Sequence, residues 1–298
     1  MNQNEFKQDL NDVLNITSAA LNVDLGSATH RGHVRENNED SFLVMRFGRS
    51  LEKLSTNLDE YLLEQNYSIT GYGMLVADGM GGMAAGEVAS RMALLKLVEL
   101  IVDTSDWTLA LKRHSDVKTV LQRMTHRFVQ IDKILKEEAS NNDDLIGMGT
   151  TLTVAGTLGS DLVLGHIGDS RAYLLRGTNF KQLTRDHTLA QALIDAGVAT
   201  SDDPAPRSMR HVLTAAIGSL DERIEPQVQR FRLTNRDQLL LCTDGLTEMV
   251  EDDVIAQVLR EAKSAQTGCQ TLIDLALSAG GTDNITVVLA RFTNNDRS

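Results

Sequence analysis

The chain has 298 residues, room for one large domain or two smaller ones, and its 42% hydrophobic and 23% charged residues are typical of a soluble globular protein. A net charge of −12 argues against nucleic acid or an anionic membrane as a partner. No run approaches about 18 apolar residues, and the polar N-terminus lacks the order of a signal peptide. We therefore expect a cytoplasmic protein, in which Cys242 and Cys269 are buried thiols.

Hydrophobic patterning predicts an α+β fold in which antiparallel strands are flanked by helices. A short helix is expected over 3–14, within an N-terminal extension of residues 1–23. Strands are expected over 24–31, 40–47, 72–78, 226–232, 238–243 and 284–292, with three or four more within 149–183. Long helices are expected over 84–103, 116–139, 251–262 and 266–279. The second of them carries a stripe of apolar residues at helical spacing: Val120, Met124, Phe128, Ile131 and Leu135.

We expect a single domain over 24–296. Two segments within it interrupt the pattern of strands and helices. The polar stretch 48–70 is interpreted as an insertion, partly helical. Residues 186–220 lose the strand rhythm and are predicted to form a short helix followed by a loop with Pro204 and Pro206. We find no internal repeat and no low-complexity linker that would divide the chain.

Four aspartates share one setting, the boundary of an apolar run beside glycine or asparagine: Asp78, Asp169, Asp244 and Asp283. A strand that meets such a turn brings its carboxylate to a sheet edge. One such turn is ordinary, but four indicate that several strands deliver acids to a common point. Carboxylate and carbonyl oxygens are the ligands that Mg²⁺ and Mn²⁺ prefer, so we hypothesise a metal-dependent hydrolase.

Each motif alone is weak, because polar turns and glycine-rich corners occur in many folds, but their order is specific. The matching motifs are RENNED at 35–40, DGMGG at 78–82, GTT at 149–151, GDSRAY at 168–173, LTRDHT at 183–188, TDGLTE at 243–248 and GTDNIT at 281–286. Over about residues 24–292 the chain resembles the metal-dependent serine/threonine protein phosphatases of the protein phosphatase 2C family, bacterial type. The resemblance implies a central antiparallel β-sandwich with helices on both sides, in αββα layers.

The resemblance also implies a pair of Mn²⁺ or Mg²⁺ ions at one end of the sandwich. Asp78 would bridge the ions and the Gly79 carbonyl would bind one of them. The protein ligands of the second ion would be completed by Glu39, Asp244 and Asp283.

Three further positions acquire roles by resemblance. Asp40 would orient the site without binding metal, and Asp169 would join Asp244 at a weaker third metal site. Arg35 would grip the substrate phosphate. The implied reaction is hydrolysis of phosphoserine and phosphothreonine monoesters by a metal-activated water, which needs no side-chain nucleophile. Ser170 and Thr151 are therefore interpreted as turn or strand hydroxyls.

Two positions depart from the family pattern. Met80 stands where many eukaryotic members carry a histidine proposed as the general acid. His187 and His33 are the nearest alternatives by motif, although His187 is more simply a hydrogen-bonded anchor for the segment that follows it. Glu248 replaces the aspartate of many relatives, which leaves its role as a direct ligand open.

The 186–220 segment aligns with the flap beside the active site, the most variable part of this family. Arg207, Arg210 and His211 make it locally basic, and we hypothesise that they contact phosphoprotein substrates, the alternative being a solvated helix end. Asp202 and Asp203 are either additional ligands of the third metal site or solvated loop acids.

The leading prediction is a monomeric phosphatase acting on phosphorylated proteins, the substrates of a Ser/Thr kinase. Arg35 favours this over the related sporulation and stress-response phosphatases, many of which lack that arginine. A non-catalytic regulatory module is a second possibility, and a hydrolase of small phosphate esters a third. Pseudo-enzymes usually lose a metal ligand, whereas this chain keeps all the acids that the resemblance requires.

Overall fold

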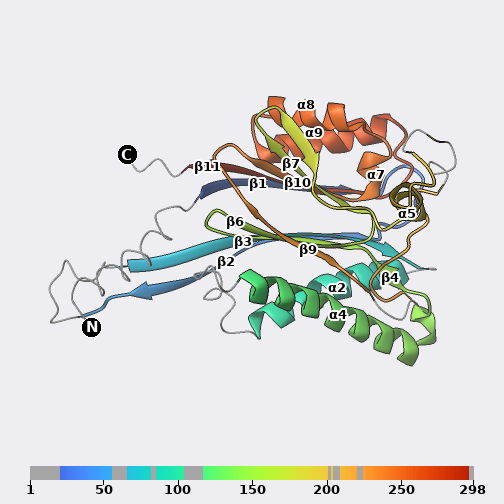
Figure 1. The fold of residues 1–298 in the computed structure, drawn as a ribbon, viewed down its shortest axis with the longest axis horizontal. Helices are drawn as coiled ribbons and strands as arrows, with labels where there is room; N and C mark the ends of the chain where they lie inside the picture. The colour runs from blue at the N-terminus through green and yellow to red at the C-terminus, as the bar shows by residue number, and fades with distance from the viewer. Residues whose placement is uncertain are drawn as a thin grey trace.

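The computed structural model describes residues 21–55, 66–81, 85–103, 117–200, 203, 209–219 and 224–294. The helix expected over 3–14 and the individual residues Asp202, Pro204, Pro206 and Arg207 lie outside these ranges. The described residues form two antiparallel sheets packed face to face, with helices on the outer side of each (Figure 1). The predicted αββα sandwich is therefore confirmed.

The first sheet has the strand order β1-β11-β10-β7-β8. Its strands are β1 (Leu21–His30), β7 (Arg171–Arg176), β8 (Asn179–Gln182), β10 (Gln238–Cys242) and β11 (Ile285–Asn294). Strand β10 lies at its centre and is buried on both faces, since Leu240 faces the outer helices while Leu239 and Leu241 face the second sheet. This alternation follows from the two-residue period of a strand.

The second sheet has the order β2-β3-β5-β6-β9, and the short β4 pairs with the end of β3. Its strands are β2 (Asp40–Glu52), β3 (Asn66–Met80), β4 (Gly149–Thr150), β5 (Leu152–Leu158), β6 (Asp161–Ile167) and β9 (Gln227–Arg232). In the β2–β3 register Asp40 lies opposite Asp78. The first acid of β2 and the acid near the end of β3 therefore meet at one end of this sheet.

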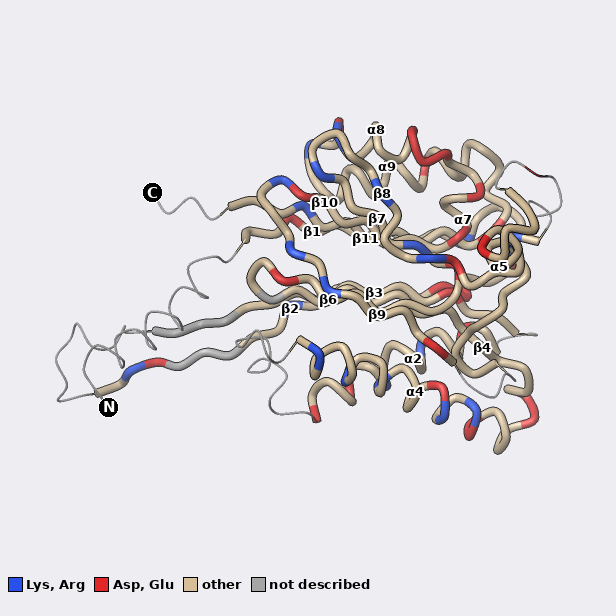
Figure 2. The backbone as a smooth tube through the Cα atoms, viewed as in Figure 1, with Lys and Arg blue, Asp and Glu red and all other residues tan. Residues whose placement is uncertain are grey.

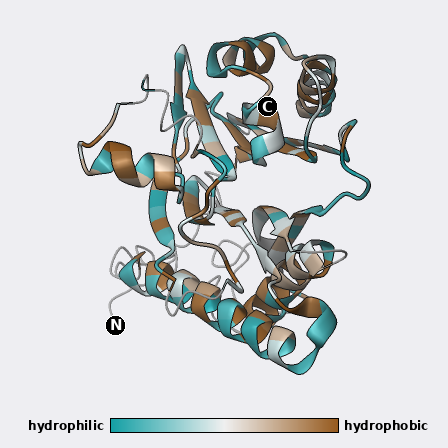
Figure 3. Cartoon of the chain, turned by 90° about the vertical axis from the view of Figure 1, so that its right-hand side faces the viewer, coloured by the Kyte–Doolittle hydropathy of each residue, from teal (hydrophilic) through white to brown (hydrophobic). Residues whose placement is uncertain are grey.

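Helices cover the outer face of each sheet, as the end-on view in Figure 3 shows. They are α2 (Ala85–Val102) and α4 (Val117–Asn141) on the second sheet, and α8 (Asp252–Glu261) and α9 (Ala265–Ser278) on the first. Shorter helices are η3 (Asp143–Leu145), α5 (Leu189–Asp195) and α7 (Asp244–Thr247). None of the described helices has the length and apolar character needed to cross a membrane.

The stripe predicted on the second long helix faces the core. Met124, Phe128, Ile131 and Leu135 are buried against the second sheet, and Val120 packs at the margin of the same cluster. Residues three and four apart share one face of a helix, which is why the sequence pattern located this contact.

Several strand boundaries differ from the prediction. Strand β1 begins at Leu21 rather than at residue 24. Strands β2 and β3 run beyond 47 and begin before 72, because residues 48–52 pair with residues 66–70 in a continuous ladder. Residues 48–52 and 66–70 of the expected insertion are therefore strand, while 56–65 lie outside the described part of the chain.

Candidate metal centre

Acids from both sheets meet at one end of the sandwich. Figure 2 shows acidic segments gathered between the sheets, near α7 and the end of β3. Asp244 follows β10 and opens α7, while Asp283 immediately precedes the turn into β11. The pKa of Asp78 is raised well above its ordinary value, first by burial and then by four neighbouring carboxylates: Asp40, Asp244, Asp169 and Asp283. The structure therefore brings together the four aspartates that the sequence singled out.

Burial and mutual repulsion act on the other members of the cluster in the same direction. Burial raises the pKa of Asp40 to about 7, although Thr243 and Thr286 donate hydrogen bonds that oppose the shift. The pKa of Asp169 is raised well above its ordinary value by burial and then by Asp244. Removing a carboxylate from water disfavours its charged form, and nearby like charges add to that cost. The carboxylates of the cluster therefore carry more negative charge than the neighbouring arginines offset.

Glycines allow Glu39 to approach the end of β3 and the start of α2. The Gly79 amide donates to the Glu39 carbonyl at 3.2 Å. A Cβ atom on Gly79 would lie 2.0 Å from the Gly86 carbonyl oxygen, and one on Gly86 would lie 3.0 Å from Oε1 of Glu39. Side chains at these two positions would displace backbone or the Glu39 carboxylate, which explains the glycine-rich turn.

Buried hydroxyls hold the acids in place. Thr243 Oγ1 donates to Asp40 Oδ2 at 2.8 Å and accepts from the Thr286 amide at 2.9 Å. Thr151 Oγ1 accepts from the Asp78 amide at 2.9 Å and lies 2.7 Å from Ser170 Oγ. Thr151 and Ser170 thus link two strand ends, which agrees with their interpretation as structural hydroxyls rather than nucleophiles.

The turn that carries Asp169 is fixed by its own contacts. Gly168 has a φ of +107°, a conformation that side chains rarely adopt, and a Cβ there would lie 2.5 Å from Thr151. The Arg171 guanidinium makes two-pronged contact with Asp186, with Nη2 to Oδ2 at 2.7 Å. Such a bidentate pair holds the hairpin in a defined geometry.

Asn284 clamps the loop between β1 and β2. Its Nδ2 donates to the carbonyls of Arg31 at 2.9 Å and Asn37 at 2.8 Å, while its Oδ1 accepts from the Glu39 amide at 2.7 Å. The residue is 4% exposed, so water does not replace these contacts readily. One side chain next to Asp283 therefore sets the path of the loop that presents Arg35 and Glu39.

Replacing Asn284 by Ala is expected to lower kcat/KM by ~10–100-fold, the usual cost of losing a group that orients metal ligands. Steady-state kinetics on a phosphothreonine peptide will measure this, with Asn179→Ala, at an exposed position on β8, as the matched control. Unchanged kcat/KM in Asn284→Ala would contradict a role for the clamp.

Arg35 lies at the exposed rim of the acid cluster. Its Nη2 is 2.6 Å from Asp283 Oδ2, and the side chain is 53% exposed. Arg31 Nη1 donates to the Arg35 carbonyl at 3.2 Å and to the Glu36 carbonyl at 3.3 Å, which shapes the loop. The guanidinium is thus positioned beside the acids with donors accessible from solvent.

The two histidines that could replace Met80 as general acid, His187 and His33, make structural contacts. His187 Nδ1 accepts from the Gly168 amide at 3.0 Å, and its ring stacks on His166 with centroids 5.2 Å apart. Burial lowers the pKa of His187, which disfavours a protonated ring. These contacts favour the anchoring interpretation. His33 is exposed and its amide donates to the Gly281 carbonyl at 2.7 Å.

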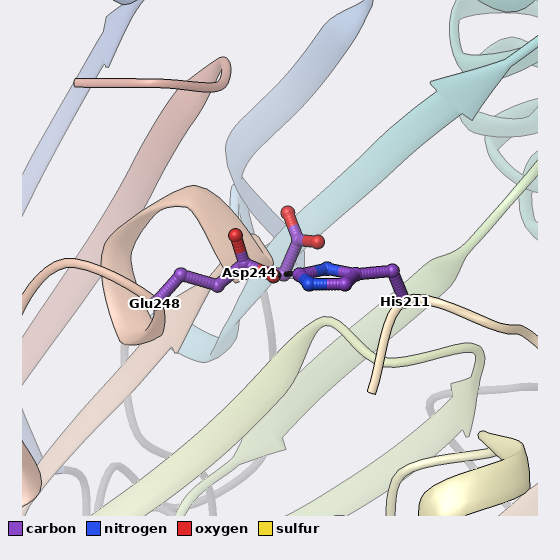
Figure 4. Close-up of side chains that lie close together, drawn as sticks. All are labelled: His211, Asp244 and Glu248. Atoms are coloured by element: carbon purple, nitrogen blue, oxygen red, sulfur yellow. Dashed lines mark ion pairs between the residues drawn. The ribbon is translucent and has the colours of Figure 1, made fainter. Parts of the chain in front are cut away.

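His211 contacts the cluster, a contact that the sequence prediction missed. Its Nδ1 lies 2.6 Å from Oε1 of Glu248, and one ligand atom each from His211, Asp244 and Glu248 lie within 4.8 Å of one another (Figure 4). The hypothesis that groups His211 with Arg207 and Arg210 as substrate contacts does not include this contact, in which the His211 ring points toward Glu248. No local pattern signals this, because the two residues belong to distant segments.

Asp203 makes local contacts in the flap. Its Oδ2 accepts from the amide of Thr200 at 2.7 Å and from the hydroxyl of Thr200 at 3.1 Å. These bonds close a local turn, an arrangement expected of a loop acid.

The donor set fits divalent cations. Two buried carboxylate oxygens, Asp40 Oδ1 and Asp244 Oδ1, have no hydrogen-bond partner among the described residues. Buried polar atoms are nearly always partnered in native structures, and hard cations bind such carboxylates. A cation would satisfy the orphaned Asp244 oxygen and offset the repulsion that raises the pKa values of this cluster.

Comparisons with known proteins agree with this geometry. The model of the family described as protein phosphatase 2C matches residues 52–274. The serine/threonine phosphatase stp of Listeria welshimeri is 34% identical over 261 residues, covering 88% of this chain and 92% of that protein. Protein phosphatase PhpP of Streptococcus pneumoniae is 32% identical over 276 residues, covering 92% and 99%.

Solved structures give the same result. The crystal structure of the Mycobacterium tuberculosis serine/threonine phosphatase PstP/Ppp matches with a TM-score of 0.71 and 31% identity, covering 91% of this chain and 99% of that one. The catalytic domain of PstP in complex with two manganese ions matches with a TM-score of 0.70 and 32% identity, covering 92% and 100%. The chain therefore belongs to the protein phosphatase 2C family. It is a metal-dependent serine/threonine protein phosphatase, as its motifs implied.

Proposed function

We propose that the acid cluster binds two Mn²⁺ or Mg²⁺ ions, in the manner of the manganese pair in PstP. Asp78 would be shared by both ions, and the Gly79 carbonyl would hold one of them. Glu39, Asp244 and Asp283 would hold the second ion. The observation that supports this most strongly is the convergence of the aspartates on Asp78, with its strongly raised pKa.

Asp40 has a positioning role in this proposal. It lies opposite Asp78 in the β2–β3 register, and Thr243 holds its Oδ2. Its contacts orient the metal ligands without placing it on an ion. Asp169 is proposed as part of a weaker, separate metal site shared with Asp244.

The two metal ions, when bound, supply positive charge that stabilises the phosphate and lower the pKa of an attacking water toward ~7. Arg35 holds the phosphoryl oxygens and offsets the charge that develops on them. Thr151 and Ser170 hydrogen-bond to each other and take no part in bond making. Met80 has no proton to donate, so protonation of the departing alkoxide falls to a group other than the residue at this position.

Phosphoproteins are the substrates of this class, and we propose that the particular substrates are serine and threonine residues phosphorylated by a partner kinase. The net charge of −12 supports a protein rather than a nucleic-acid partner. The unpaired, buried Cys242 and Cys269 suit a reducing compartment, which supports the cytoplasm as the location. We also propose a monomeric single domain over 24–296, with 186–220 as its flap.

Replacing Arg35 by Ala is expected to lower kcat/KM for a phosphothreonine peptide by ~10–100-fold, because charge-assisted hydrogen bonds to phosphate are lost. Arg35→Lys should recover only part of the activity, since an ammonium cannot make the two-pronged contact of a guanidinium. Steady-state kinetics on the peptide will measure both changes.

Manganese affinity, measured by calorimetry, must be followed in parallel because Arg35 also contacts Asp283. We expect unchanged stoichiometry in both variants. Arg91→Ala, which removes an exposed arginine of α2, is the control. Wild-type kinetics in Arg35→Ala would contradict the phosphate-binding role.

A further inference from the structure

A cavity of about 70 Å³ lies between the second sheet and the helices that cover it. Strands β2, β3, β5 and β6 form its wall on the sheet side, and α2 and α4 form its wall on the helix side (Figure 1). None of the proposed metal ligands is among the described residues that line it. The cavity is therefore a feature separate from the metal centre.

Facing glycines create this space. Gly73 on β3 and Gly156 on β5 lie opposite each other in the ladder, and both line the cavity. Neither has a positive φ, so backbone conformation does not require glycine here. A Cβ atom on Gly73 would lie 2.9 Å from the Met45 side chain, whereas one on Gly156 would meet no atom of the described residues within 4 Å. Glycine inside a strand often marks a place where a ligand approaches closely.

Two arginines of α4 line this otherwise apolar space. Arg123 and Arg127 lie one helical turn apart, and Arg127 is only 9% exposed. Burial and then the charge of Arg123 lower the pKa of Arg127, so the two guanidinium groups repel each other. The described lining contains no aspartate or glutamate. A guanidinium has several N–H donors, so each arginine can bind an anion in addition to its other partners.

We propose that this cavity binds a short-chain carboxylate, with its carbons against the glycines of the sheet and its carboxylate on Arg123 and Arg127. The volume sets the size of the ligand: an apolar cavity of ~150 Å³ holds benzene, so half that volume suits roughly three carbon atoms. The charge sets its head group, because guanidinium groups match a carboxylate in geometry and charge. The inference does not rest on the proposed metal pair.

The probe for this site is butanoate, which joins three apolar carbons to a carboxylate. Butanamide, an uncharged molecule of nearly the same shape, is the matched control ligand. Hydrogen bonds to charged groups contribute more than those between neutral groups, so we expect the Kd of butanoate to be ~10-fold below that of butanamide. The bound anion should also offset the repulsion between the arginines and raise the melting temperature.

The test is an NMR titration of the full chain with ¹³C-labelled methionine methyl groups. Met45 and Met124 line the cavity, and substitution of each by leucine assigns its signal. Both signals should shift as butanoate saturates the site, with the same Kd in magnesium and in EDTA. Shifts that need magnesium would place butanoate at the metal centre and overturn the proposal. The titration in EDTA does not depend on the metal pair, so its failure would leave the proposed reaction intact.

Two variants test the walls of the cavity. Gly156→Val fills the open space and should abolish saturable binding, while Arg123→Gln should weaken butanoate by ~10-fold and leave butanamide unchanged. Arg91→Gln, at an exposed position of α2, is the control and should bind as the wild type does. A dispersed methyl spectrum shows that each variant is folded. Equal affinity of the wild type for butanoate and butanamide, or wild-type butanoate affinity in Arg123→Gln, would overturn the proposal.

Discussion

Asp78→Asn is expected to reduce kcat/KM for a phosphothreonine peptide by at least ~10³-fold, because the bridging position acts on both ions. Losing a single stabilising group in an active site already costs ~10²–10³-fold. The proposed role makes Asp78 more important than the terminal ligands, since its loss disturbs the charge and the spacing of the pair together. Steady-state kinetics at saturating manganese will measure the effect.

The same substitution should stabilise the metal-free protein. Asp78 is crowded by carboxylates that raise its pKa, and an amide of similar shape carries no charge to repel them. The expected result is a higher melting temperature for Asp78→Asn than for the wild type in EDTA. Asp274→Asn, an exposed substitution on α9, is the control for both experiments. Near-wild-type activity in Asp78→Asn would contradict the bridging role.

Manganese is expected to change how stability depends on pH. Burial holds the pKa of Asp40 at about 7, against ~3.9 for an unfolded aspartate, and those of Asp78 and Asp169 are also raised. At pH values between the unfolded and folded pKa of these aspartates, the folded state binds more protons than the unfolded state. The contribution of these groups to the unfolding free energy therefore decreases as pH rises from about 4 toward 7.

Urea unfolding in EDTA at about pH 5 and about pH 7.5 should show this loss in the wild type and a smaller loss in Asp78→Asn. Bound manganese should oppose it, since a ligand at roughly one hundred times its Kd stabilises the folded state by about 2.7 kcal/mol. A wild-type loss no larger than that of the variant would contradict the assignment of these pKa shifts to the acid cluster.

The strands and the acids at their ends were predictable because both depend on local pattern. Apolar runs that stop at Asp-Gly located the ends of β3 and β10, and the spacing of Met124, Phe128 and Ile131 located the buried face of α4. The order of the motifs indicated the family and, through it, the β-sandwich. No single apolar segment specifies that fold.

Features that depend on contacts between distant segments were not predictable. The pairing of 48–52 with 66–70 involves short polar sequences without a clear strand period, and only the ladder itself extends β2 and β3. The contact of His211 with Glu248 depends on how the flap lies across α7. The pairing of Arg35 with Asp283 likewise joins the first motif of the sequence to the last one, about 250 residues away.

The most direct test of the account is phosphate release from a phosphothreonine peptide, measured with manganese, with EDTA and with Asp244→Asn. Asp244 is the residue to change because it belongs to the cluster and its buried Oδ1 has no hydrogen-bond partner in the described part of the chain. The account predicts manganese-dependent release that is lost with the chelator and in the variant. Release that persists in EDTA, or no release from a wild-type protein that calorimetry shows to bind two ions, would contradict it.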